Sequence, residues 1–354
     1  MIAKMPSSKT ARLSDVAQAA GVSIGTASRV LNDSFRVNAL ARAAVRKAID
    51  ELGYVPPPIE KRSGRRAGIA AAKSTGRLLV LLPGPVDLKW LLDHAPVYAY
   101  ALHSIEREVA NRGLTLSIQR FDDWETIPRL VAADNMLRGL IFLGWAIPGY
   151  SANMKFNVPA VWTMGLNVDF TGDHFVPNGL LIGKLAAEYL LRRGHRHCAI
   201  LGPQLDLSRH AVVSFGDRFA AFIDCVEAQG GDVLQLIDSN LTSDEAELAT
   251  ETLVQRLVDA KPRPKGLFCW SASLAPLVYR CLEKRGIVIG KDIDIILCNN
   301  DRPFLAALRP QPAVIDIQPE YIGRRAVERL LWRIDNLDSP AEKVAIAPKL
   351  LEKL

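Results

Sequence analysis

Apolar positions divide the chain into a short helical region near the N-terminus and a long region in which strand and helix patterns alternate. In residues 15–20 apolar side chains recur at helical spacing, and Gly21 ends the pattern in a position suited to a left-handed backbone. Ser23 is a suitable N-cap for a second helix, and Asn38 for a third. The third helix has one apolar face, formed by Ala41, Val45, Ala48, Ile49 and Leu52. Short helices joined by a tight glycine-containing turn are typical of a helix-turn-helix.

From residue 77 onward, short apolar runs alternate with amphipathic segments of helical length. This alternation predicts an α/β body of parallel sheets with crossover helices. Strands are expected over residues 78–82, 114–119, 139–144, 159–164, 198–202, 232–238, 266–270, 293–297 and 313–317. Helices are expected over residues 97–111, 180–193, 215–229 and 273–285. With 354 residues, the chain exceeds the roughly 250–300 at which one core usually stops growing, so more than one domain is expected.

Charge separates the same two regions. The formal net charge is +6, but residues 1–77 hold 14 lysines and arginines against 5 acidic residues, a net charge of +9, and the rest of the chain carries −3. A positive excess confined to one end is typical of a nucleic-acid-binding module, because neutralising phosphates releases counterions. A basic, solvated tail is the alternative that charge alone leaves open.

Composition excludes several other classes. A hydrophobic fraction of 49% with 23% charged residues is typical of a globular protein. The chain has no apolar run near the roughly 18–20 residues that cross a bilayer, and residues 1–13 lack the apolar segment of a secretory signal, so we expect a cytoplasmic protein with no membrane partner. The five cysteines are far apart and form no C-x-x-C pair, so neither disulfides nor a zinc site is indicated, and no metal or other cofactor is expected.

Two stretches near the N-terminus resemble a known family. They are Leu13-x-Asp15-Val16-Ala17-x-x-Ala20-Gly21-Val22-Ser23-x-x-Thr26-x-Ser28-Arg29-Val30-Leu31-Asn32 and Glu51-Leu52-Gly53-Tyr54-x-Pro56. This pattern resembles the DNA-binding headpiece of the LacI/GalR (lactose-repressor) family of bacterial transcription regulators. The resemblance implies a three-helix headpiece over residues 10–57, followed by a linker over 58–76 and an effector-binding and dimerisation domain over 77–354.

The second predicted helix has the chemistry of a DNA-reading helix. Small and hydroxyl side chains near its start allow close approach to the major groove, and Arg29 can make a bidentate contact to a guanine edge. Ile24 can touch a thymine methyl, and the resemblance implies that Ile24 and Gly25 occupy positions that vary with the operator and that Tyr54 contacts phosphate. The candidate DNA-contacting residues are Ser23, Ile24, Gly25, Thr26, Ser28, Arg29, Asn32, Tyr54 and Arg62.

The linker departs from the family pattern. By register, Ser63 stands where the family has a leucine that wedges between base steps, and a hydroxymethyl group is too small and polar for that role. Gly64 and the residues after it make a long hinge helix unfavourable. The linker is therefore expected to be a flexible, basic segment that follows phosphates, and an atypical hinge.

The resemblance continues through the body, where Gly194-His195-Arg196-x-x-Ala199-Ile200-x-Gly202-Pro203 matches a family segment. It implies two doubly wound lobes like those of periplasmic sugar-binding proteins, with a ligand in the cleft between them. Arg218 stands where the family has an effector-binding arginine, whereas neutral residues replace carboxylates at several other matched positions. The candidate effector-binding residues are Asp87, Trp90, Trp145, Met164, Arg218, Trp270, Ser271, Asn299 and Asn300. A lone histidine at a helix-to-strand turn, such as His195, is expected to be structural.

These observations favour a sequence-specific transcriptional regulator of the repressor type. One headpiece offers little surface, so a homodimer on a pseudo-palindromic operator in double-stranded DNA is expected, with a carbohydrate-like small molecule as effector. One alternative is a regulator whose cleft no longer senses a small molecule, and another is a solute-binding protein. A sugar-acting enzyme is disfavoured, since the sequence has no P-loop, H-E-x-x-H motif or nucleophile elbow.

Overall fold

The N-terminal unit is formed by the three predicted helices, α1 (Leu13–Ala19), α2 (Ile24–Leu31) and α3 (Ala39–Leu52). The computed structural model describes residues 11–31, 39–54, 76–84, 89, 95–144, 150, 154, 156–165, 169–204, 213–242 and 245–352. The chain divides into two units, residues 1–74 and 75–354. Asn38, the predicted cap of the third helix, lies outside the described residues, as does most of the linker, including Ser63 and Gly64.

Turn and cap chemistry in this unit follow the sequence prediction. Gly21 has a φ of 63°, a left-handed backbone that favours glycine, and it ends α1. The Thr26 amide donates a hydrogen bond to Ser23 Oγ at 3.1 Å, so Ser23 is the N-cap of α2. The core consists of Val16, Ala17, Ala27, Val30, Val45 and Ala48. Leu52 was predicted to lie on the apolar face of α3, and this was wrong, since the residue is 41% exposed. Tyr54 packs on that end of the core instead.

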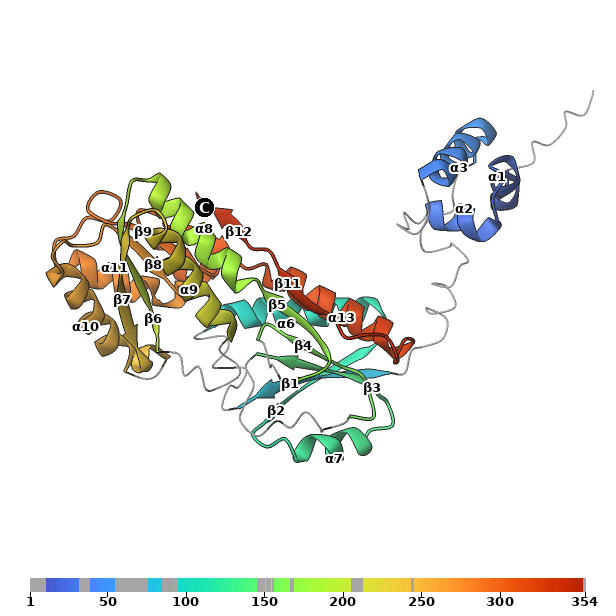
Figure 1. Ribbon diagram of the computed structural model, residues 1–354. Helices are drawn as coiled ribbons and strands as arrows, with labels where there is room; N and C mark the ends of the chain where they lie inside the picture. The colour runs from blue at the N-terminus through green and yellow to red at the C-terminus, as the bar shows by residue number, and fades with distance from the viewer. Residues whose placement is uncertain are drawn as a thin grey trace, which may run out of the picture. The chain divides into compact units, whose positions relative to one another are not determined.

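The second unit contains two six-stranded sheets, each covered by helices on both faces (Figure 1). The first sheet has the order β2-β1-β3-β4-β5-β11, and its neighbouring strands are all parallel. Its strands are β1 (Arg77–Pro83), β2 (Thr115–Phe121), β3 (Leu137–Leu143), β4 (Ala160–Thr163), β5 (Asp173–Pro177) and β11 (Lys343–Ile346). One face packs against α6 (Pro96–Asn111) and α13 (Pro319–Ile334), and the other against α7 (Thr126–Ala132). We call this layered structure lobe 1.

Lobe 2 repeats the arrangement, with the order β7-β6-β8-β9-β10-β12. Its strands are β6 (His197–Pro203), β7 (Asp232–Asp238), β8 (Gly266–Cys269), β9 (Asp294–Cys298), β10 (Ala313–Asp316) and β12 (Lys349–Leu351), of which β12 is antiparallel to β10. One face packs against α8 (Gly179–Arg192) and α9 (Val213–Glu227), and the other against α10 (Ala246–Asp259) and α11 (Ala275–Glu283). The shorter elements are η3 (Ser239–Thr242), η4 (Ala272–Leu274) and α12 (Arg302–Leu305). The structure confirms the predicted α/β class and every strand predicted from the apolar pattern, and it adds β5, β11 and β12.

The chain passes between the lobes at three places: after β5, after β10, and between β11 and β12 (Figure 1). These connectors are joined by hydrogen bonds. The Asn178 amide donates to the Ile346 carbonyl oxygen at 2.9 Å, and Gln318 Nε2 donates to the Ala347 carbonyl oxygen at 2.6 Å. Because β5, β10 and β11 all lead into connectors from their carboxyl ends, the carboxyl ends of the parallel strands of both sheets face the junction between the lobes.

A buried aromatic cluster lies between the first sheet and α7. Trp162 on β4 is fully buried and stacks on Phe142, with ring centroids 4.8 Å apart. Its Nε1 donates a hydrogen bond to the Gly144 carbonyl oxygen at 2.8 Å, at the carboxyl end of β3. Trp124 and Phe170 pack around the same ring. The cluster therefore holds the carboxyl end of β3, which faces the junction between the lobes, in place.

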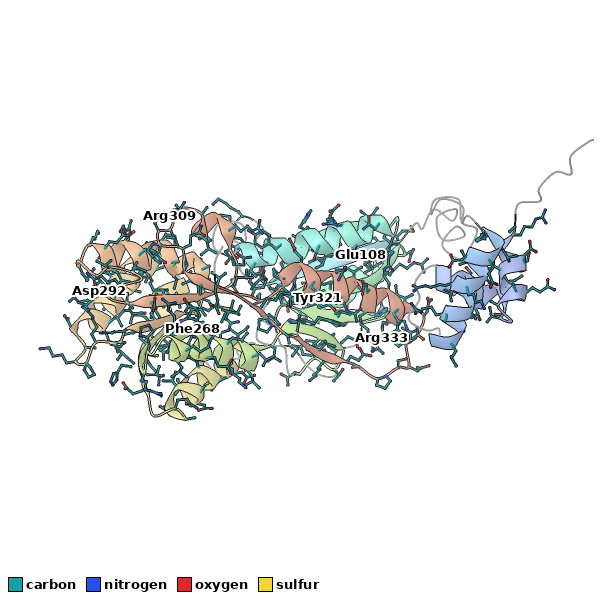
Figure 2. The ribbon with its side chains drawn as sticks, turned by 90° about the horizontal axis from the view of Figure 1, so that it is seen from above. Glu108, Phe268, Asp292, Arg309, Tyr321 and Arg333 are labelled. Atoms are coloured by element: carbon teal, nitrogen blue, oxygen red, sulfur yellow. The ribbon has the colours of Figure 1, made fainter. Side chains whose placement is uncertain are left out.

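A charged network joins β5, α13 and the segment leading to β11. Asp173 on β5 is fully buried and accepts hydrogen bonds from Arg333 Nε and Nη2, each at 2.8 Å. The Glu342 amide donates to the same carboxylate at 2.8 Å, and Arg329 Nε lies 3.1 Å from it. Figure 2 shows Arg333 and Tyr321 on α13, which lies beside the helix that carries Glu108. The network thus anchors the returning chain to lobe 1.

Candidate nucleic-acid interface and ligand cleft

The beginning of α2 forms the exposed surface on which the predicted DNA contacts lie. Ser23, Ile24 and Gly25 are all exposed, and Ile24 is 56% exposed although it is apolar. Ser23 Oγ lies 2.9 Å from Thr26 Oγ1, so the two hydroxyls form one polar edge at the N-terminus of the helix. Thr26 and Ser28 are half-buried. An exposed helix N-terminus with small side chains can approach a phosphate backbone closely.

For several other predicted DNA contacts, the structure describes only the backbone or does not describe the residue. The backbone of Arg29 belongs to α2, but its side chain lies outside the described residues, as do Asn32 and Arg62. Tyr54 is half-buried against the headpiece core, and its amide donates to the Ile49 carbonyl oxygen at 3.0 Å. The ring of Tyr54 therefore has a packing role, and its predicted phosphate contact stays a prediction.

Arg218 lies at the junction of the two lobes. It projects from α9, is 2% exposed, and donates a hydrogen bond from Nη1 to the Trp270 carbonyl oxygen at 3.2 Å. Burial raises the pKa of Tyr98 on α6 of lobe 1, and the nearby Arg218 charge opposes that rise. Trp270 ends β8, next to the point between β6 and β8 at which the strand order reverses, where open α/β sheets bind ligands. The structure thus brings the predicted Arg218 and Trp270 together.

A close helix crossing sets the position of Arg218. A Cβ atom added to Gly183 on α8 would lie 2.1 Å from the Arg218 carbonyl oxygen and 2.9 Å from the Phe222 amide nitrogen. Only glycine lets α9 approach α8 this closely without displacement. Gly183 therefore allows the close packing of α8 and α9 that positions Arg218, and the sequence prediction missed this residue.

Met164 and Asn299 occupy equivalent places in the two lobes. Each follows the fourth strand of its sheet and has a left-handed backbone, with φ values of 68° and 73°. The Met164 amide donates to the Phe175 carbonyl oxygen and the Asn299 amide to the Ile315 carbonyl oxygen, both at 3.0 Å. Left-handed residues other than glycine are costly and cluster at functional sites. The predicted Met164 and Asn299 therefore mark the same turn on both sides of the junction.

The remaining predicted cleft residues differ in their surroundings. The Ser271 hydroxyl caps η4, where its oxygen accepts from the Ser273 amide at 3.3 Å. Asn300 Nδ2 donates to Asp316 Oδ2 at 3.2 Å, beside a cavity of about 350 Å³. Three predicted residues, Asp87, Trp90 and Trp145, lie outside the described residues.

Sequence reasoning missed the titratable residues of this cavity, of which Asp301 is the most deeply buried. Asp301 is fully buried in the cavity wall. Burial raises the pKa of this carboxyl to about 7, the nearby Asp316 charge adds to the rise, and the Val97 amide and the Asn299 side chain oppose it. The signal available in the sequence was its place directly after Asn299-Asn300 at the end of a strand, where ligand-binding side chains collect.

His195 has the structural role expected from its position. Its Nε2 lies 2.6 Å from Asp294 Oδ2, and Arg193 Nε donates to the same oxygen at 2.7 Å. Across the described residues, no group of three or more histidine, cysteine or acidic side chains is arranged to hold a metal ion. In the same part of the chain, no helix has the length and apolar character needed to cross a membrane.

Comparisons with known proteins match both units. Residues 12–57 match the family described as bacterial regulatory proteins, lacI family, and residues 187–353 match the periplasmic binding protein-like domain. The HTH-type transcriptional repressor PurR of Photorhabdus laumondii is 28% identical, and that of Proteus mirabilis is 26% identical. Each alignment covers 97% of this chain and 96% of the relative.

Solved structures of the same architecture are similar over nearly the whole chain. The Lac repressor dimer bound to operator and the anti-inducer ONPF has a TM-score of 0.61 at 20% identity, covering 97% of this chain and 98% of that one. The complex of the transcriptional regulator CelR with cellobiose has a TM-score of 0.61 at 20% identity, covering 96% of this chain and 98% of that one. At this identity the likeness demonstrates a shared fold.

Proposed function

We propose that the chain, whose residues 12–57 match the lacI family of bacterial regulatory proteins, is a repressor that binds operator DNA in the cytoplasm as a homodimer. The observation that carries the proposal is the exposed start of α2 on a basic unit, where the small residues Ser23 and Gly25 flank the exposed apolar side chain of Ile24. The two relatives named PurR are transcriptional repressors and not enzymes. We propose that residues 10–57 bind DNA, that 58–76 form a basic linker, and that 77–354 bind effector and pair the protomers.

We expect Arg29→Ala to weaken operator binding by about 1–3 kcal/mol, because it removes a bidentate contact to a guanine edge. Binding to random DNA should change much less. The measurement is fluorescence anisotropy with a selected operator and a scrambled duplex at one fixed salt concentration. Arg46→Ala, which removes an exposed charge from α3, is the matched control and should lower both affinities equally. An equal loss on both duplexes for Arg29→Ala would show that Arg29 contacts only phosphate.

We further propose that a hydroxylated small molecule binds at the lobe junction and changes the geometry of paired headpieces. Support comes from the placement of Arg218 beside Trp270 and from the CelR relative, which is described as a complex with cellobiose. An effector that distinguishes the DNA-bound and free states by 1–3 kcal/mol would be typical of allosteric coupling. A fork of fixed N–H donors, as in Arg218, suits hydroxyl or acid groups of such a ligand.

We expect a titration of the protein against sugars and sugar acids to identify at least one ligand that shifts operator affinity. The Arg218→Lys variant should bind that ligand about tenfold more weakly, since lysine keeps the charge but loses the fork. Lys184→Ala, on the exposed side of α8, is the control and should bind normally. If Arg218→Lys binds unchanged, Arg218 is not in the site, and if no compound in the panel binds, the cleft does not sense this class of molecule.

A further inference from the structure

A cavity of about 350 Å³ lies where α6, the loop after β9, the end of β10 and the start of α13 meet. Of the predicted effector residues placed by the structure, only Asn300 lines it. Its wall also includes Tyr100 and Tyr321 from lobe 1, and Asp301 and Asp316 from lobe 2. The cavity therefore offers acidic and aromatic groups from both lobes to one occupant.

The most unusual member of this wall is Asp301. Its side chain has no exposed surface, and among the described residues neither carboxylate oxygen makes a hydrogen bond of good geometry, although the Val97 amide and the Asn299 side chain lie near enough to lower its pKa. Burying a carboxylate without partners is costly, and native proteins rarely leave such a group unsatisfied without a functional reason. The cavity in front of Asp301 is where a partner can be supplied.

The buried side-chain atoms of this wall that lack a hydrogen-bond partner within the described residues are all acceptors. Asn300 Oδ1 is buried and, in the part of the chain described, also lacks a partner, while Nδ2 of the same side chain donates to Asp316. One oxygen of Asp316 takes that bond, and the other accepts from the Gln318 amide at 2.7 Å. An occupant must therefore bring donors, and an ammonium group is the common ligand group that has three donors and no acceptor.

The surrounding charges and rings favour the same occupant. The charged groups lining the cavity with Asp301 are Asp316, Glu320, Arg302 and Lys349. Arg302 and Lys349 are exposed, and within the described chain neither forms an ion pair with Asp301. The rings of Tyr100 and Tyr321 offer electron-rich faces, which attract cations in aromatic-lined sites. Inside the cavity, the acidic groups outweigh the basic ones.

We propose that this cavity binds the ammonium group of a small organic amine, with Asp301 as its counter-ion. The inference goes beyond the proposed ligand at Arg218 and Trp270, since this cavity contains neither residue and selects a cation; it rests on the proposed function only for its effect on operator affinity. A ligand held by Tyr100 of lobe 1 and by Asp301 of lobe 2 stabilises the arrangement in which the lobes are close together. Amine binding would therefore favour one arrangement of the two lobes, and through that arrangement it would change operator affinity.

Proton binding competes with the amine. Since the pKa of Asp301 lies at about 7, the carboxyl is mostly neutral at pH 6 and mostly ionised at pH 8. The amine binds the ionised form, so its affinity should fall about tenfold from pH 8 to pH 6, following the ionised fraction. Burial and Asp316 raise this pKa in the folded chain, so the fold itself is favoured by the protonated form and is less stable as the pH rises from about 4 to 7.

The test is isothermal titration of the full chain with ethanolamine, putrescine and benzylamine, each paired with its neutral counterpart: ethylene glycol, 1,4-butanediol and benzyl alcohol. At pH 8 we expect at least one amine to bind ten times or more tightly than its alcohol, and to lose that advantage at pH 6. The Asp301→Asn variant should lose the amine preference and keep or raise its unfolding temperature at pH 8, because it removes a charge that burial penalises.

The proposal is overturned if no amine binds better than its alcohol, if the preference is the same at pH 6 and pH 8, or if Asp301→Asn retains it. The first two readouts use the unaltered chain, so they hold even if the variant fails to fold. Operator binding, measured on the same preparation, tests the proposed function separately. A chain that binds operator but no amine would overturn only the amine site.

Discussion

Asp173→Ala should lower the free energy of unfolding by about 3–5 kcal/mol, the cost of removing one partner from a buried ion pair. The carboxylate receives two hydrogen bonds from Arg333 and one from the Glu342 amide, and Arg329 lies beside it. Without the acid, two guanidinium groups remain poorly exposed: Arg333 loses its carboxylate partner, and Arg329 keeps its ion pair with Glu342. Urea unfolding followed by circular dichroism would measure the loss.

The matched control is Asp232→Ala. Asp232 also pairs with a basic side chain, His197, but 65% of its side chain is exposed. A pair so exposed to water contributes little, so we expect a change below about 1 kcal/mol. Equal effects of the two substitutions would show that the Asp173 network does not stabilise lobe 1.

Trp162→Ala should also destabilise the protein by about 3–5 kcal/mol, because it opens a cavity in the aromatic cluster of lobe 1. The ring is fully buried against Phe142 and is held by a hydrogen bond to the Gly144 carbonyl oxygen. Thermal unfolding followed by far-ultraviolet circular dichroism would measure the loss of stability. The loss should be accompanied by weaker effector binding, since Gly144 ends β3 at the lobe junction.

Trp162→Phe separates the two contributions. It keeps an aromatic ring against Phe142 but removes the indole N–H, so the cost should fall to about half that of the alanine variant or less. If phenylalanine and alanine destabilise equally, the hydrogen bond and not the packing of the ring holds this strand end.

Apolar periodicity was sufficient to predict most of the fold. Strands such as β1 and β6 are buried on both faces, so they are continuous apolar runs that stand out in the sequence. The strand β5 does not stand out, because Asp173 and His174 make it polar, and the burial of Asp173 depends on the distant Arg333, Arg329 and Glu342 amide. The short strands β11 and β12 contain lysines and depend on pairing with β5 and β10.

The candidate site was predictable in part for a similar reason. Arg218 could be found because it stands at a matched family position, and Ser23 because capping is a local property. Asp301 could not be ranked from the sequence, since aspartate after a strand is usually a solvated turn residue. Its distinction is burial without a partner, which depends on α6 and α13 from elsewhere in the chain.

The three connectors also determine when each part of the protein can fold during synthesis. Lobe 1 begins at β1 but needs α13 and β11, which are translated after most of lobe 2, and lobe 2 in turn needs β12 at the very end. The α1–α3 unit, whose core among the described residues comes from residues 13–54, is translated before the body has begun. A ribosome that stops early would therefore release a folded DNA-binding unit attached to sheets with open edges, a product prone to aggregation.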